Sequence, residues 1–160
     1  MLNPDNRRNH DMKLDTLVSE LITEQDWRNA WPVLVAYRPQ LKLDDLLARR
    51  EELQSEGYKL IGLCIQDQVK AMAGIQVLPH ILGSKDLRVH DLATHPDERR
   101  KGYGEQLMGA IVNLARQLKC SRILLYSRLS NTNAHRFYEK KAGLERYGIE
   151  FKMELGETPL

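Results

Sequence analysis

Two nearly continuous apolar runs, residues 58–65 and 69–78, constrain the fold more than any other feature of the sequence. Only a short polar stretch around Asp67 separates them, which favours a tight turn. A strand with one solvent-facing side alternates apolar and polar residues, whereas a strand covered on both faces can be apolar throughout. The runs therefore predict a β-hairpin inside a sheet that carries helices on both faces.

The remaining sequence supplies those helices and further strands. Thr23, followed by acidic residues, is typical of a helix start, and Pro32 is expected to kink or divide the helix that follows. A single apolar stripe runs along residues 104–119, and strict alternation over 147–155 predicts a last strand. The predicted order is strand 14–22, helices 26–37 and 43–55, strands 58–65, 69–78 and 87–94, helix 104–119, strand 122–127, helix 132–141 and strand 147–155. This order predicts an α/β (α+β) fold with a mixed sheet covered by helices.

Length and composition exclude several classes of protein. The 160 residues suit one domain, expected over 13–157 after a flexible tail of residues 1–12. A formal charge of +2 is too small to predict a nucleic-acid partner. The only two cysteines, Cys64 and Cys120, cannot form a disulfide framework or a four-cysteine zinc site, and the histidines lack metal-ligand spacing. No apolar run approaches the roughly 20 residues of a membrane span. We expect a cytoplasmic protein without a metal.

A glycine-containing segment between the strand over 87–94 and the long helix predicts an anion site. The first turn of a helix has unpaired N–H groups and a partial positive charge. Gly102 and Gly104 lack a Cβ, so a phosphate oxygen could approach this backbone closely. Arg99, Arg100 and Lys101 add positive charge beside it. Together these residues predict a cradle for a diphosphate.

Two other phosphate motifs do not match the sequence. A P-loop requires Gly-x-x-x-x-Gly-Lys-Ser/Thr, which is absent. The dinucleotide fingerprint requires a small residue three positions after Gly104, where the chain has Leu107. A nicotinamide dinucleotide is therefore not expected.

The cradle segment is also part of a family resemblance. Arg99-Arg100-Lys101-Gly102-Tyr103-Gly104 satisfies the pattern Arg/Gln-x-x-Gly-x-Gly/Ala, and residues 131–138 satisfy Asn-x-x-Ala-x-x-x-Tyr. Over about residues 87–144 the chain resembles the GNAT superfamily of acyl-CoA-dependent N-acetyltransferases. Thr94 and Leu144 are mild departures from its pattern. The resemblance implies a mixed, mostly antiparallel sheet of six to seven strands, flanked by about four helices.

The resemblance also implies a donor, an acceptor class and site residues. Acetyl-CoA would donate an acetyl group to a primary amine of a small molecule or a protein, by direct attack in a ternary complex. Asn131 would bond the CoA, and Tyr138 would lie beside its thioester sulfur and act as the general acid. The strand residues and the cradle would hold the remainder of the CoA: Leu92, Ala93, Thr94, Arg99, Arg100, Lys101, Gly102, Tyr103, Gly104 and Glu105.

Three questions stay open at the level of the sequence. His90 and Asp91 are both candidates for the general base, and because adjacent strand residues face opposite sides, only one is expected to point into the acceptor cleft. A CoA-binding sensor or interaction module without transferase activity is the alternative function. The last strand could pair across a two-fold axis in a homodimer.

Overall fold

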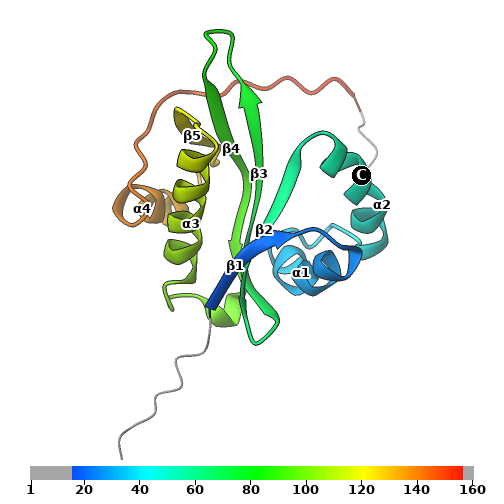
Figure 1. Ribbon diagram of the computed structural model, residues 1–160. Coiled ribbons are helices and arrows are strands. Elements are labelled where there is room, and N and C mark those ends of the chain that lie inside the picture. The colour runs from blue at the N-terminus through cyan, green and yellow to red at the C-terminus, as the bar shows by residue number, and fades with distance from the viewer. Residues whose placement is uncertain (1–15, 157–160) are drawn as a thin grey trace, which may run out of the picture.

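The central sheet of the protein has five strands within residues 16–156, the part of the chain that the computed structural model describes. The first four strands are antiparallel, and the fifth is parallel to the fourth. They lie side by side in chain order: β1 (Thr16–Leu21), β2 (Tyr58–Ile65), β3 (Gln68–Pro79), β4 (Lys85–Thr94) and β5 (Arg122–Leu125) (Figure 1). The expected tail over 1–12, like both ends of the expected domain 13–157, lies outside the described residues.

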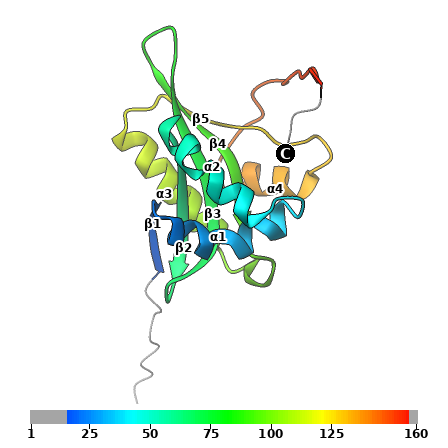
Figure 2. The ribbon, with the colours of Figure 1, turned by 90° about the vertical axis from the view of Figure 1, so that its right-hand side faces the viewer.

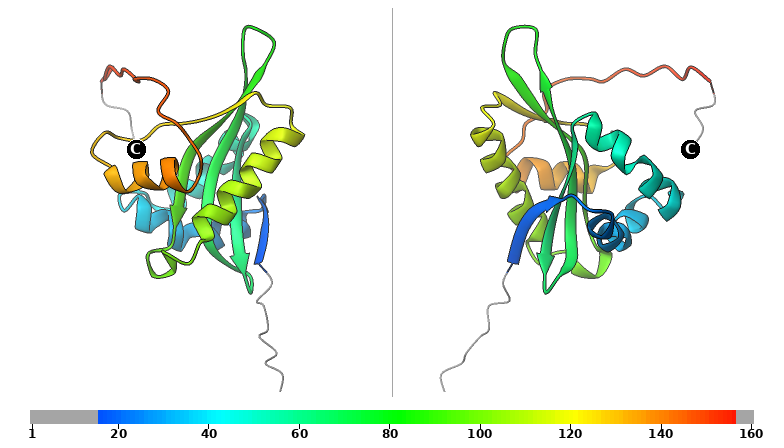
Figure 3. Two further views of the ribbon diagram at one scale, coloured as in Figure 1. Left: turned by 90° about the vertical axis from the view of Figure 1, so that its left-hand side faces the viewer. Right: turned by 45° about the vertical axis from the view of Figure 1, so that its right-hand side comes forward.

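Helices cover both faces of this sheet. Helices α1 (Glu24–Tyr37) and α2 (Leu43–Ser55) lie on one side, and α3 (Tyr103–Gln117) lies on the other, with α4 (Thr132–Lys140) beside it (Figures 1 and 3). A 3₁₀ turn, η1 (Pro96–Glu98), connects β4 to the loop before α3. None of these helices has the length and apolar content that crossing a membrane requires.

The hairpin of β2 and β3 is buried on both faces, as its two apolar runs predict. Leu63 and Ile75 are fully buried in the cluster that α3 covers, whereas Leu60 and Met72 belong to the cluster under α1 and α2. The two-residue turn between the strands, Gln66–Asp67, has positive φ at both positions, the backbone form that closes tight hairpins. The predicted fold class is therefore confirmed.

Two predicted details are wrong. The first is the division into two short helices at Pro32: α1 runs from Glu24 to Tyr37 as one helix, because the residues packed against the sheet, among them Trp27 and Val33, keep both halves in place, while a kink at Pro32 stays a prediction. Residues 147–155 form no strand, so the sheet has five strands in the described chain instead of six or seven. A strand needs a hydrogen-bonding neighbour, and this segment instead crosses the end of the sheet as an extended stretch (Figure 1).

Candidate functional site

The loop that leads into α3 has a run of free backbone donors. Arg100 has φ 64° and Gly102, the residue before α3, has φ 82°, so the chain turns sharply twice within three residues. The N–H groups of residues 100–105 donate to no acceptor within residues 16–156. Consecutive N–H groups in such a turn form a concave donor set that suits an anion. The loop therefore has the free donors that the sequence predicts for it, and its role as a diphosphate cradle stays a prediction.

Gly104 lies where a helix and a strand come close together. A Cβ at this position would stand 3.4 Å from Cζ of Phe137 on α4 and 3.5 Å from Oγ1 of Thr94 on β4. These distances are at the lower end of ordinary contact, so any side chain longer than a methyl group must displace a neighbour or extend into the space before the cradle. The absence of a Cβ therefore keeps the cradle accessible.

The three cations beside the cradle are not equivalent. Nζ of Lys101 lies 2.6 Å from one carboxylate oxygen of Glu98, whose other oxygen lies 3.0 Å from Nζ of Lys70. The Lys101 ammonium and then the Lys70 ammonium, as hydrogen-bond donors, lower the pKa of Glu98. Arg99 and Arg100 are exposed and form no ion pair within residues 16–156. Two guanidinium groups, not three cations, thus remain for an anionic ligand.

Strands β4 and β5 part beside this cradle. Their parallel pairing ends at Val89 and Leu125, although β4 continues to Thr94. Asp91, Leu92, Ala93 and Thr94 pair with β3 on one edge, and no strand pairs with their other edge within residues 16–156. Backbone donors and acceptors along this edge are available to an extended ligand.

A β-bulge brings both base candidates to one place. The register between β3 and β4 shifts between Gly74 and Ile75, which leaves His90 without a paired residue. Oδ2 of Asp91 accepts a hydrogen bond of 3.1 Å from the Tyr58 hydroxyl, and the His90 ring centroid lies 5.8 Å from that of Tyr58. The expectation that His90 and Asp91 diverge is therefore wrong, because a bulge interrupts the alternation of side chains on which it relied.

The two candidates have different partners. The Arg38 guanidinium donates to Oδ1 of Asp91, 2.9 Å from Nε, so both oxygens of this carboxylate are engaged. Nε2 of His90 lies 3.1 Å from Oε1 of Gln76, whose amide nitrogen donates to the Glu56 carbonyl. This second bond orients the Gln76 oxygen toward His90, so Nε2 carries the proton and Nδ1 keeps its lone pair. Burial lowers the pKa of His90, which keeps the imidazole neutral.

Sequence reasoning missed Tyr58, which orders this region. Its ring lies 6.2 Å from that of Trp27, and a Cβ on Gly74 would stand 1.7 Å from its hydroxyl oxygen. Burial, followed by the negative charge of Asp91, raises the pKa of Tyr58, so the phenol stays neutral and acts as a donor. The position opens a strand, and no spacing in the sequence marks it.

We expect Gly74→Ala to destabilise the fold, because the added methyl group overlaps the Tyr58 side chain and forces it out of its place. Such overpacking typically costs about 1–3 kcal/mol of the free energy of unfolding, measured by urea titration. Gly109→Ala on α3 is the matched control, since a Cβ there meets no neighbouring atom. If the overlap with Tyr58 is the cause, Gly74→Ala should lower the free energy of unfolding by a smaller amount in a protein that already carries Tyr58→Leu. An unchanged unfolding midpoint for Gly74→Ala would contradict this role of Tyr58.

Tyr138 lies on α4, and Asn131 is the capping residue directly before that helix. Burial raises the pKa of Tyr138, and the nearby Tyr37 at the end of α1 raises it further. The ring packs edge-on against Phe137, 5.7 Å between centroids. Asn131 caps α4, with its side-chain oxygen 3.4 Å from the amide nitrogen of Ala134. Helix α1 packs against β4 (Figure 2), and Tyr37 at its end lies close enough to Tyr138 of α4 to affect the pKa of that phenol.

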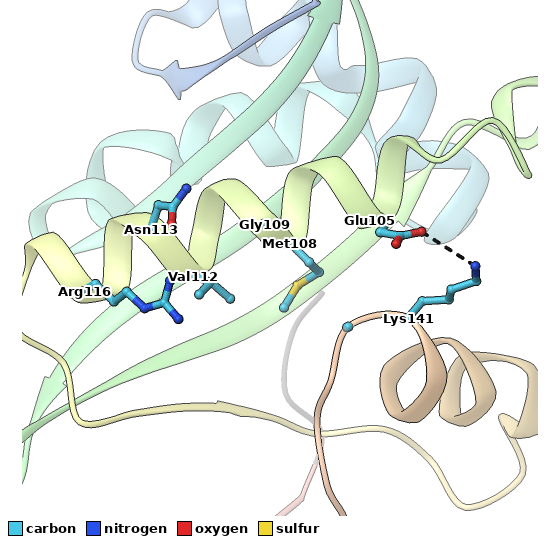
Figure 4. Close-up of a pocket in the computed structure, with 8 residues that line it drawn as sticks. Glu105, Met108, Gly109, Val112, Asn113, Arg116 and Lys141 are labelled. Atoms are coloured by element: carbon cyan, nitrogen blue, oxygen red, sulfur yellow. Dashed lines mark ion pairs between the residues drawn. The ribbon is translucent and has the colours of Figure 1, made fainter.

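Two further features of this region lie outside the sequence predictions. Oγ of Ser127 is buried and has no hydrogen-bond partner among the described residues 16–156, two residues beyond the point where β5 leaves β4. A cavity of about 340 Å³ also follows α3 from Glu105, where the cradle ends (Figure 4). Across its mouth Glu105 lies 4.0 Å from Lys141. Its lining residues are Glu105, Met108, Gly109, Val112, Asn113, Arg116, Lys141 and Ala142.

Within residues 16–156, no group of three or more His, Cys, Asp or Glu side chains could hold a metal ion.

This architecture suits a protein that holds an anionic group at the start of a helix and an extended chain along an open strand edge. The sequence profile described as "Acetyltransferase (GNAT) family" matches residues 22–144, which is most of the chain. The chain therefore belongs to the GNAT family and is an N-acetyltransferase. Members of this family generally use acetyl-CoA as the acetyl donor.

Individual relatives agree with this membership. An uncharacterized N-acetyltransferase, YhdJ, of Bacillus subtilis is 30% identical over 127 residues, which cover 79% of this chain and 89% of the relative. A glucosamine 6-phosphate N-acetyltransferase of Schizosaccharomyces pombe is 36% identical over 64 residues, 40% of this chain and 54% of the relative. The crystal structure of a ribosomal-protein-alanine N-acetyltransferase from Brucella melitensis superposes with a TM-score of 0.74 at 18% identity, covering 89% of this chain and all of that one. This last likeness concerns the fold alone.

Proposed function

We propose that this chain transfers the acetyl group of acetyl-CoA to a primary amine by direct attack in a ternary complex. The observation that carries the proposal is the set of free N–H groups over residues 100–105, next to the open edge of β4. The amides of Arg100 to Glu105 would hold the CoA diphosphate, with Arg99 and Arg100 adding charge. The open edge at Leu92, Ala93 and Thr94 would hold its amide-containing arm, together with Asn131 and the Ser127 hydroxyl, which has no partner in the described part of the chain.

The acceptor must lose a proton before it can attack. An alkylamine with a pKa near 10.4 is neutral in roughly one molecule in a few thousand at pH 7. We assign this proton to Nδ1 of His90, since that nitrogen keeps its lone pair while Nε2 bonds to Gln76. Asp91 is a positioning residue in this proposal, because Arg38 and Tyr58 already engage both of its oxygens.

Charge also develops on the donor side of the reaction. The thioester of acetyl-CoA supplies the activated acetyl group and a thiolate leaving group. A free N–H near Ala93 on the open edge of β4 would donate to the acyl oxygen as it becomes negative. Tyr138 would then protonate the leaving sulfur, since its raised pKa keeps the phenol protonated at neutral pH. Each proton thus has a named donor and acceptor.

The acceptor in this proposal is an amine-bearing small molecule or a protein amine. A screen over amine classes would identify it. Purified protein with acetyl-CoA should release free thiol with at least one of an amino sugar phosphate, a polyamine, an aminoglycoside or a peptide N-terminus. A Gly104→Glu variant supplies the background rate. CoA binding without thiol release from any amine class would instead favour the non-catalytic sensor.

We place the reaction in the cytoplasm, the reducing setting in which unbridged thiols such as Cys64 and Cys120 persist.

The assignment of His90 predicts the acid side of the pH profile. The neutral imidazole is the active form, and burial lowers its pKa below the ordinary 6.5. Activity is therefore expected to persist at neutral pH and to fall only as pH drops through this lowered pKa. Steady-state kcat/KM between pH 5 and 8, measured with an amine whose own pKa exceeds 9, tests this. His90→Gln should remove this acid limb and lower kcat about 100-fold or more. The same limb in His90→Gln would exclude His90 as the base.

A further inference from the structure

The Arg38 side chain, directly after α1, carries unused hydrogen-bond donors. Oδ1 of Asp91 accepts from Nε and Nη2 of Arg38, and Oδ2 accepts from the Tyr58 hydroxyl. A guanidinium group has five N–H bonds. The N–H bonds of Arg38 that do not point to Asp91 donate to no acceptor within residues 16–156. A ligand at this place therefore meets free donors, whereas both oxygens of the neighbouring carboxylate are already engaged.

Two contacts hold the Arg38 guanidinium in one orientation. One edge of it lies against Asp91, and its central carbon lies 5.2 Å from the centroid of the Tyr37 ring. The Arg38 side chain is 45% exposed and that of Asp91 is 13% exposed, so the exposed part of the guanidinium is the part turned away from the carboxylate. A planar donor group that is already oriented loses little entropy when it binds an anion.

The guanidinium also adjoins both groups that we assign to proton transfer. Arg38 bonds to Asp91, the neighbour of His90 at the bulge in β4. Tyr37, the residue before Arg38, lies close enough to Tyr138 to raise the pKa of that phenol, although burial is the larger cause. An amine held between His90 and Tyr138 would therefore lie near the free donors of Arg38.

We infer that the acceptor carries a carboxylate or phosphate group close to its amine, and that Arg38 binds this group. The inference rests on the acetyl transfer proposed above and names the class of its acceptor. Asp91 occupies the Nε–Nη2 edge, so the end formed by Nη1 and Nη2 remains and presents two parallel N–H bonds. This geometry matches two oxygens of a carboxylate or a phosphate. The anion would lie on the side of the cation away from Asp91, which limits the repulsion between the two negative charges.

Matched pairs of acceptors test this inference. The two members of a pair share the amine, and only one carries the anion: glucosamine 6-phosphate with glucosamine, and ω-amino acids of increasing length with their amides. The value of kcat/KM from thiol release, corrected for the neutral fraction of each amine, should be about tenfold higher or more for the anionic member of the best pair. The two kinds of pair distinguish phosphate from carboxylate. A ratio near one for every pair would overturn the inference.

Variants of Arg38 test whether this residue is the cause of the preference. Arg38→Gln removes the charge and should bring the ratio within each pair close to one. Arg38→Lys keeps a cation without the parallel N–H bonds and should retain part of the preference. Arg28→Gln on α1 is the matched control, because Arg28 pairs with Glu24 at an exposed position, and it should keep the full ratio. If Arg38 only supports Asp91, Arg38→Gln lowers both members of a pair equally and leaves the ratio unchanged, which would exclude Arg38 as the anion-binding residue.

A binding measurement separates this inference from the acetyl transfer on which it rests. The complex of the protein with CoA is titrated with the same pairs in a calorimeter, which requires no transfer. Tighter binding of the anionic member that is lost in Arg38→Gln, without thiol release, would support the anion site and contradict the transfer. Thiol release with equal affinity for both members would support the transfer and overturn the anion site. No detectable binding of any anionic member would overturn it as well.

Discussion

Gly104→Glu is expected to abolish the binding of acetyl-CoA. The Cβ would already touch Phe137 and Thr94, so the rest of the side chain must extend into the space before the free N–H groups. A carboxylate about 5 Å from a phosphate charge costs roughly 3 kcal/mol at an effective dielectric constant of 20, a factor on the order of 100 in affinity. Steric exclusion adds to this loss. Isothermal titration calorimetry with CoA provides the measurement.

The control for this variant lies on the same helix. Gly109→Glu introduces the same charge and side chain at an exposed position where a Cβ meets no neighbouring atom. It should keep the affinity for CoA within a few-fold of the original protein, since it lies beyond the first turn of α3. Equal affinity of the Gly104→Glu variant and the original protein for CoA would contradict the assignment of residues 100–105 as the diphosphate site. It would also contradict the proposed acetyl transfer.

Tyr138→Phe is expected to lower kcat by about 100-fold or more, the range typical of losing a general acid. Only the hydroxyl is removed, so the packing against Phe137 and the affinity for acetyl-CoA should change little. The informative comparison is therefore between the change in kcat and the change in the dissociation constant for acetyl-CoA. Stopped-flow detection of thiol release gives the first quantity and calorimetry gives the second.

Tyr147→Phe is the matched control for the hydroxyl, because its ring lies against Arg122 of β5 and the residue has no role in the proposed reaction. It should leave kcat unchanged. A pH profile adds a second criterion: because burial raises the pKa of Tyr138, the original protein should keep its donor protonated beyond pH 10, the ordinary phenol value. A Tyr138→Phe variant with the original kcat would show that the leaving thiolate needs no protein acid.

The cradle shows how far local sequence can predict a site. Helix starts, glycines and neighbouring cations act over a few residues, so Gly102, Gly104 and the stripe of α3 could be interpreted without knowledge of the rest of the chain. Local reasoning already fails within the basic triplet. Lys101 pairs with Glu98, which Lys70 also contacts from β3, and no pattern near Lys101 indicates that distant partner.

The contacts around Asp91 show why the rest could not be predicted. Asp91 lies 53 positions from Arg38 and 33 from Tyr58, so its engagement depends on the packing of α1 and β2 against β4. The bulge at His90 adds one residue to β4 relative to β3, which is a property of the pair of strands and not of either sequence. An alternation argument applied to β4 alone therefore placed His90 and Asp91 on opposite sides.

The sequence by itself determined a hairpin covered on both faces, a helix with one apolar side and a sharply turning glycine loop between strand and helix, for which the diphosphate cradle is predicted. Each follows from the order of residues within about twenty positions. Only the tertiary structure decided that β4 and β5 part after Val89, that Tyr58 contacts both Asp91 and His90, and that residues 147–155 have no strand beside them in the described part of the chain. Strand pairing and side-chain packing join distant parts of the chain, and the free energy of such contacts depends on which partner is present. A periodic sequence indicates only that one face of the segment needs something to pack against, and it does not identify that partner.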